Sequence, residues 1–462
     1  MFLLFALHVP LGVLMYKFGA LAVLHPLLVI GLGMYWAMQK QEPIAKVAYV
    51  AAYLIGVEVL WRMAEAPIFW EFGKYGSALI MIAALVRRGV ARVPSLPFFY
   101  LVLLIPACYV TFALNNWTDF RDRISFNMSG PICLFVCCWF FSQVHLTEAQ
   151  LKKLILFIAI PLLSVAIATL FFTMTASDLQ FNTESNPMTS GGFGPNQVSS
   201  MLGLGVFLTA SALLLFRNDI KTTVLLVVLT LLFASQSVLT FSRGGIYAAV
   251  GALMILAIFQ ARDFGQFIKR ILPVIFVGVI FLLAVFPYLN NFTGGKLEER
   301  FESSDTTNRY SIMEMEIQMF AENPLFGVGV GEAISQRLQM SQQLAASHTE
   351  FTRLISEHGS LGVLAILSLV VASILNMRKQ TTRSGKALVA GSLVWAGLFM
   401  GNAGMRLAAP AFMWGLSFVL IVESASSRKA LATRAKQKRN GAQPVFRKKR
   451  LLLPPPEESE QS

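Results

Sequence analysis

Residues 240–260 read TFSRGGIYAAVGALMILAIFQ, an apolar segment with an arginine, Arg243, near its beginning. The apolar part is about as long as the 17–25 residues that cross a bilayer as a helix. Similar segments recur along the 462 residues, 55% of which are hydrophobic, and a soluble domain does not bury that much apolar surface. The sequence therefore predicts an all-α, polytopic membrane protein, a helical bundle of about 12–14 spans.

We predict fourteen apolar segments, of which the first is short and is either re-entrant or merged with the second. They lie at residues 2–16, 18–38, 44–61, 70–87, 97–114, 126–143, 152–174, 197–215, 221–239, 244–260, 271–289, 354–375, 387–404 and 407–424.

The distribution of lysine and arginine predicts which side of the membrane each loop faces. With the N-terminus in the cytoplasm, 26 of the 38 Lys and Arg residues lie inside and 12 lie outside, as the positive-inside rule requires. Ten of the inner 26 follow residue 427, in a basic tail that we expect to be disordered and close to anionic lipid headgroups. Nucleic acid is a weak alternative for this tail and is not predicted as a partner. Both termini are thus predicted to be cytoplasmic.

Arg243 then faces the outside, and two interpretations are open. An arginine at a membrane boundary often extends to the headgroups as an anchor. However, Ser242 and Gly244 flank it at the start of a helix, where exposed N–H groups and a guanidinium together favour an anion, particularly phosphate.

The longest polar segment, about residues 290–353, is also predicted to lie outside. It contains a predicted helix of about 15 residues with Arg309 and Glu316 on one side, ended by Asn323-Pro324. The glycines that follow, in 327-GVGVG-331, resemble a phosphate-binding loop only weakly and favour a tight turn against the bundle.

The stretch 347-SHTEFTRLISEHGSLGVLAIL-367 enters the next span. If it is helical throughout, Glu350, Arg353 and Glu357 form a self-satisfied ladder of charges, which makes Glu357 structural rather than catalytic. His348 lies on the opposite side, where it is either an ordinary solvated histidine or a functional one.

Other candidates on the predicted outer face are Arg62, Asn196 and Arg406. Glu65 is a candidate acidic base for a metal-dependent glycosyltransferase, but no cluster of carboxylates accompanies it. The chain has neither DxD nor HExxH, and neither Ser-x-x-Lys nor GxSxG. We therefore predict no metal, no cofactor and no acyl-enzyme chemistry.

Three motifs occur in a distinctive order. They are Ser242-Arg243-Gly244 at the start of a span, Arg309 followed by 323-NPLFGVGVG-331, and His348 followed by 357-EHGSLG-362. This order resembles the O-antigen ligase and polysaccharide polymerase family of bacterial envelopes. The stretch 194-GPNQVSSMLGLG-205 is similar to exopolysaccharide polymerases of that family. Thr349 departs from the family, in which asparagine often follows the histidine.

The resemblance implies a metal-independent glycosyltransferase of the inner membrane. Such enzymes transfer a glycan from an undecaprenyl diphosphate carrier to an acceptor hydroxyl, on a glycan or a lipid A core, at the periplasmic face. His348, Arg243 and Arg309 are implied to be catalytic. The residues expected to bind substrate are Arg406, Arg62, Asn196, Ser242 and Gly244. Membrane lipid is an expected partner, and other polysaccharide-assembly proteins are candidates.

The implied organisation has four parts: an N-terminal bundle (1–289), a periplasmic loop with the catalytic residues (290–353), C-terminal membrane helices (354–424) and the basic tail (425–462). The stretch 194–205 favours a polymerase. O-antigen ligase and protein O-glycosylation remain open within the family. A lipid-linked glycan flippase or another transporter is the non-enzyme alternative, although transporters usually place charges near the membrane midplane.

Overall fold

A computed structural model describes residues 2–176, 180–185, 187–216, 218–303, 309–341 and 347–422. The predicted basic tail, 425–462, lies outside these residues.

The described chain is almost entirely helical, which confirms the predicted fold class. Within the described part, nine helices have the length and apolarity that a membrane span needs, so this is a multi-pass membrane protein. Thirteen of the fourteen predicted segments coincide with long helices. These are α1 (Phe2–Lys17), α2 (Gly19–Met38), α3 (Ala45–Met63), α4 (Phe72–Arg87), α5 (Ser95–Leu114), α6 (Trp117–Phe141), α7 (Glu148–Thr175), α8 (Pro195–Leu215), α9 (Ile220–Leu239), α10 (Gly244–Gln260), α11 (Phe264–Ile280), α16 (Glu350–Lys379) and α17 (Arg383–Ala403).

The predicted last span, 407–424, is not one continuous helix. This segment forms a short helix, α18 (Ala409–Gly415), a 3-10 turn, η3 (Leu416–Phe418), and a strand, β2 (Leu420–Val422), which pairs in parallel with β1 (His145–Thr147). Residues 407–419 are all buried inside the protein. The segment is apolar because protein surrounds it, and apolar composition alone does not distinguish that environment from lipid.

Small residues let α8, α10 and their neighbours approach closely. A Cβ on Gly203 would lie 2.2 Å from the carbonyl oxygen of Gly245, and one on Gly245 would lie 2.0 Å from that of Ser199. The Ser199 hydroxyl also donates to the carbonyl of Ser242 at 2.6 Å. Small residues and hydroxyl groups are typical of packed membrane helices, and here they hold the start of α10 against α8.

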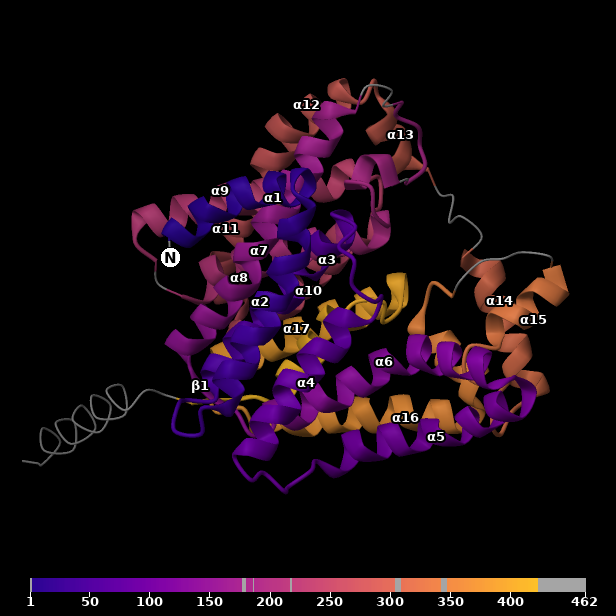
Figure 1. Cartoon of the computed structure of the whole chain (residues 1–462). Coiled ribbons are helices and arrows are strands. Elements are labelled where there is room, and N and C mark those ends of the chain that lie inside the picture. Colours follow the sequence, from indigo (N-terminus) through magenta and orange to yellow (C-terminus); the bar gives the residue numbers. More distant parts are fainter. Residues whose placement is uncertain are drawn as a thin grey trace, which may run out of the picture. The chain divides into compact units, whose positions relative to one another are not determined.

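The long polar segment continues from the π-helical turn η2 (Phe281–Val285) into four short helices. They are α12 (Phe286–Phe292), α13 (Lys296–Glu302), α14 (Arg309–Glu322) and α15 (Ala333–Ser341). The predicted helix that ends at Asn323-Pro324 is α14, and it packs against α16 (Figure 1).

The glycine-rich turn after α14 docks onto α16, as predicted. The N–H groups of Val328 and Gly329 donate to the carbonyls of Ser356 and Glu357 at 3.0 and 3.1 Å. α16 is kinked at this point, where Gly359 adopts a positive φ of 62°. The absence of a side chain at Gly359 lets the backbone of the turn approach closely.

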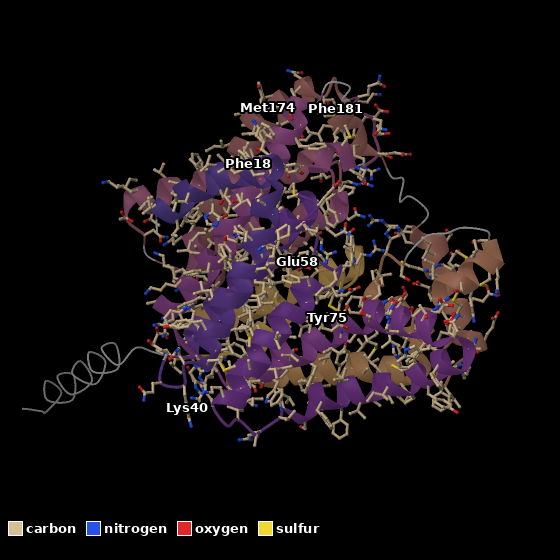
Figure 2. All side chains as sticks on the ribbon, in the orientation of Figure 1. Phe18, Lys40, Glu58, Tyr75, Met174 and Phe181 are labelled. Atoms are coloured by element: carbon tan, nitrogen blue, oxygen red, sulfur yellow. The ribbon has the colours of Figure 1, made fainter. Side chains whose placement is uncertain are left out.

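Loops predicted to face opposite sides of the membrane lie at opposite ends of the bundle. Figure 2 shows Phe18, Met174 and Phe181 toward one end and Lys40 toward the other. We refer below to the first end as the predicted outer face.

Candidate functional site

Arg243 occupies the position just before α10, at the end of a tight loop after α9. In this loop Phe241 has a positive φ of 57° and is fully buried. The Ser242 hydroxyl donates to Asn196 Oδ1 at 2.8 Å, which ties the loop to the beginning of α8. The guanidinium of Arg243 donates to the carbonyl of Ser303, in the long polar segment. The loop therefore joins α8, α10 and the segment after α13.

Arg309, at the start of α14, reaches the same place. Its Nη1 donates to Asn402 Oδ1, and its Nη2 lies 3.4 Å from Asn196 Oδ1. Asn196 therefore accepts from both Ser242 and Arg309. Gly244 leaves the room that Asn402 occupies, because a Cβ at position 244 would lie 2.2 Å from Asn402 Nδ2.

A third arginine lies beside these two. Arg300, on α13, is buried and donates from Nε to the carbonyl of Phe241 at 3.1 Å. Burial lowers the pKa of Arg309, and the neighbouring charges of Arg300 and Arg243 lower it further. In the described part of the chain Arg309 pairs with amide oxygens and forms no ion pair with a carboxylate. We call Arg243, Arg300 and Arg309 the arginine cluster; it is a concentration of positive charge suited to an anion with several oxygens.

His348 lies next to this cluster, in the residues that precede α16. Since α16 begins at Glu350, His348 is not on a helix as the projection assumed. Burial, and then the charges of Arg309, Arg406 and Arg337, lower the pKa of His348 to about 4. The imidazole is therefore neutral at pH 7. No hydrogen-bond partner for either ring nitrogen lies among the described residues.

The neighbours of His348 in the chain hold it in place. Thr349 caps α16, because its hydroxyl accepts from the N–H of Phe351 at 3.2 Å. Arg406 donates to the carbonyl of Ser347 at 3.1 Å. The threonine that departs from the family pattern thus serves as the helix cap.

A cavity of about 330 Å³ adjoins this segment. Ser347, Thr349 and Arg406 line it, together with residues from α4, α6 and α15. The cavity lies between several elements that meet at the predicted outer face. Such a position is typical of ligand sites in helical bundles.

The predicted ladder of charges is confirmed. Arg353 pairs with Glu350 and, at 2.6 Å, with Glu357. Glu350 also accepts from the N–H of Met405 at 3.1 Å, so the ladder anchors the loop that carries Arg406. Glu357 is paired with Arg353, in agreement with a structural role.

Arg62 is engaged elsewhere. It pairs with Glu58 at 2.8 Å, stacks on Trp70 at 4.2 Å and donates to the carbonyl of Arg406 at 3.3 Å. These contacts support the loop of Arg406, and none of them joins Arg62 to the arginine cluster.

Two residues of the site were not predicted from the sequence. Asn402 lies at the end of an apolar helix, where a lone amide four residues before Arg406 is a detectable signal. Arg300 lies in 296-KLEERFE-302, where it looks like one of several surface charges. Its burial becomes evident only in the fold.

A comparison with curated proteins gives no match. Residues 226–367 match a family model described as O-antigen ligase. The matched segment includes Arg243, Arg309 and His348, whereas Asn196, Asn402 and Arg406 lie outside it. The match supports the family that the sequence resembles: over residues 226–367 the chain is similar to the O-antigen ligase family.

Proposed function

We propose that the chain is a glycosyltransferase of the bacterial inner membrane that polymerises O-antigen or exopolysaccharide repeat units. The donor is a glycan on undecaprenyl diphosphate, and the acceptor is a hydroxyl at the periplasmic face. One observation carries this proposal. Arg243, Arg309 and His348 come from three separate segments and are electrostatic neighbours through Arg309, whose partners among the described residues are amides and not carboxylates.

The arginine cluster would bind the diphosphate. Arg243 and Arg309 present planar donors, which make paired, charge-assisted hydrogen bonds to phosphate oxygens. As the C1–O bond of the donor sugar breaks, negative charge grows on the departing diphosphate. Donors already in place stabilise this charge more strongly in the transition state than in the ground state, and the proposed reaction uses no metal or cofactor.

His348 would act on the acceptor. The acceptor oxygen bonds to C1, and its proton passes to the neutral imidazole and then to solvent. The pKa of about 4 describes the site without substrate. A bound diphosphate offsets the arginine charges and raises that pKa, which makes the imidazole a better base when the donor is present.

Attachment of a finished chain to lipid A core is the second candidate, and the description of the matched family favours it. Protein O-glycosylation is a third acceptor class. Each of these uses the same donor chemistry.

Analysis of a deletion strain distinguishes these functions. The strain carries wild type, Arg243→Lys or His348→Ala, and both envelope glycans and lipid-linked intermediates are extracted. For a polymerase we expect single repeat units to accumulate on the carrier in both variants, while long chains are lost. Long chains that persist on the carrier but are missing from lipopolysaccharide would indicate a ligase, and unchanged glycan in both variants would contradict either enzyme.

A further inference from the structure

Lys74, near the start of α4, is a buried cation in the wall of the 330 Å³ cavity. Only 2% of its surface is exposed. In the described part of the chain its ammonium group makes neither an ion pair nor a hydrogen bond, and the ring of Phe126 lies 5.7 Å from it. A buried ammonium is costly unless a counter-charge accompanies it, so the position calls for an explanation.

The carboxylates that line the cavity are already occupied. Glu350 and Glu357 both pair with Arg353, and Asp122 pairs with Arg121 at 2.9 Å. None of them forms an ion pair with Lys74. The arginines of the lining that have carboxylate partners are Arg123, Arg337 and Arg353.

Two carboxylates behind Lys74 act on it only through space. Glu58 and Glu71 attract the ammonium electrostatically, but neither forms an ion pair with it. Glu58 is bound by Arg62 at 2.8 Å and by the N–H of Ala408 at 2.8 Å. The cavity therefore contains a cation for which the described chain provides no ion-pair partner.

The cavity also has an aromatic side chain in its wall, near the point where α4 and α6 meet. α4 and α6 are joined where Tyr75 donates to the carbonyl of Ser125 at 3.3 Å. The next residue on α6, Phe126, lines the cavity beside Lys74. An ammonium next to an aromatic ring is suited to a ring-shaped ligand that carries a negative charge. The ligand ring packs on Phe126, and its charged group pairs with the ammonium of Lys74.

The position of the cavity relative to His348 indicates which substrate would bind in it. The cavity is lined by Ser347 and Thr349, the two residues adjacent to His348, and by Arg406, whose charge acts on His348. The arginine cluster, on the donor side of the proposed reaction, does not line it. A ligand in the cavity therefore lies on the acceptor side of His348.

We propose that this cavity binds an acidic sugar residue of the acceptor glycan, with Lys74 as the counter-ion of its charged group and Phe126 packed against its ring. A volume of about 330 Å³ lies at the lower end of the usual range for small-ligand sites, about 300–1,000 Å³. The assignment of this sugar to the acceptor rests on the proposed function, whereas binding of an acidic sugar in the cavity does not depend on it.

Equilibrium binding to the purified full-length protein tests this without any transfer reaction. The probes are a trisaccharide that ends in glucuronate, the same trisaccharide that ends in glucose, and one that ends in glucose 6-phosphate. The variants are Lys74→Gln, Lys74→Met and the control Lys296→Gln. Lys296 is an exposed lysine of α13 that pairs with Glu299, so the control removes one charge outside the cavity.

Wild type and Lys296→Gln should bind at least one charged probe about 10- to 100-fold more tightly than the glucose probe, as a charged hydrogen bond warrants. Both Lys74 variants should lose that preference while their affinity for the glucose probe is unchanged. The two charged probes distinguish a carboxylate from a phosphate ester as the recognised group.

The proposal is overturned if wild type shows no preference for a charged probe, or if both Lys74 variants keep it. A parallel transfer assay separates the two claims. A preference in a protein that transfers no glycan would contradict the proposed function alone, whereas transfer without a preference would contradict this inference alone.

Discussion

Replacing Arg309 by lysine keeps one positive charge in the arginine cluster but removes one of two donor positions. Arg309 reaches Asn402 through Nη1 and Asn196 through Nη2, and a single ammonium at the end of a different stem does not reproduce this fork. A hydrogen bond from a charged donor contributes about 1.5–3 kcal/mol. Loss of one such contact, together with the paired geometry toward phosphate, should lower kcat/KM about 10- to 100-fold, at about 1.4 kcal/mol for each factor of ten.

The assay measures chain elongation by purified protein with a lipid-linked repeat unit as substrate, at matched protein concentration. Arg121→Lys is the control, because Arg121 is an exposed arginine that pairs with Asp122. We expect the control to match wild type within about twofold, since exposed ion pairs contribute about 0–1 kcal/mol. An Arg309→Lys protein that folds normally and retains more than a third of wild-type kcat/KM would refute the reasoning.

Three further predictions concern the pH profile and two glycines. Because the pKa of His348 is lowered from 6.5 to about 4, its neutral form persists on acidification, so kcat/KM should stay level from pH 7.5 to pH 5.5 and fall only near pH 4; an acid limb centred near pH 6.5 would contradict this assignment. Gly244→Ala places a Cβ 2.2 Å from Asn402 Nδ2 and should reduce kcat/KM at least about tenfold by displacing the partner of Arg309, and wild-type kinetics would show that the contact is dispensable. Gly359→Ala places a side chain at a residue with positive φ, against the docked turn, and should destabilise the fold by about 1–3 kcal/mol in thermal unfolding. Gly397→Ala is the control and should not destabilise the fold, because no atom lies within 4 Å of the new Cβ. Equal unfolding midpoints for the two variants would contradict the docking argument.

The membrane helices could be predicted because their signal is local. Each span needs its own run of apolar residues, and thirteen such runs coincide with helices of the structure. The run at 407–424 does not, because burial inside protein selects the same residue types as burial in lipid. The environment of α18 depends on what packs around it, which a linear pattern does not record.

The sequence allowed the functional motifs to be assigned to one face of the membrane. It did not allow the contacts between them to be predicted. Arg243 and Arg309 stood out as arginines beside glycine or at a helix start. Asn196 was a candidate through its own motif. Asn402 was missed because its partner, Arg309, lies 93 positions earlier in the chain. Such pairs become visible only when the helices are assembled.

Arg62 has a partner that could be predicted from the sequence. Its pairing with Glu58 is an i, i+4 contact, and the sequence contained enough information to predict it. A charged residue that a near neighbour satisfies is a weaker candidate for substrate binding than one held by amides, as Arg309 is. The substrate-binding role given to Arg62 remains a prediction.

The most direct test of the central claim is elongation of lipid-linked repeat units by purified protein in proteoliposomes, compared between wild type, Arg243→Ala and His348→Ala. We expect wild type to convert single units into longer chains on the carrier, and each variant to lose at least about 99% of that activity while it stays folded. Elongation at wild-type rate in both variants would contradict the claim that the arginine cluster and His348 carry out the transfer.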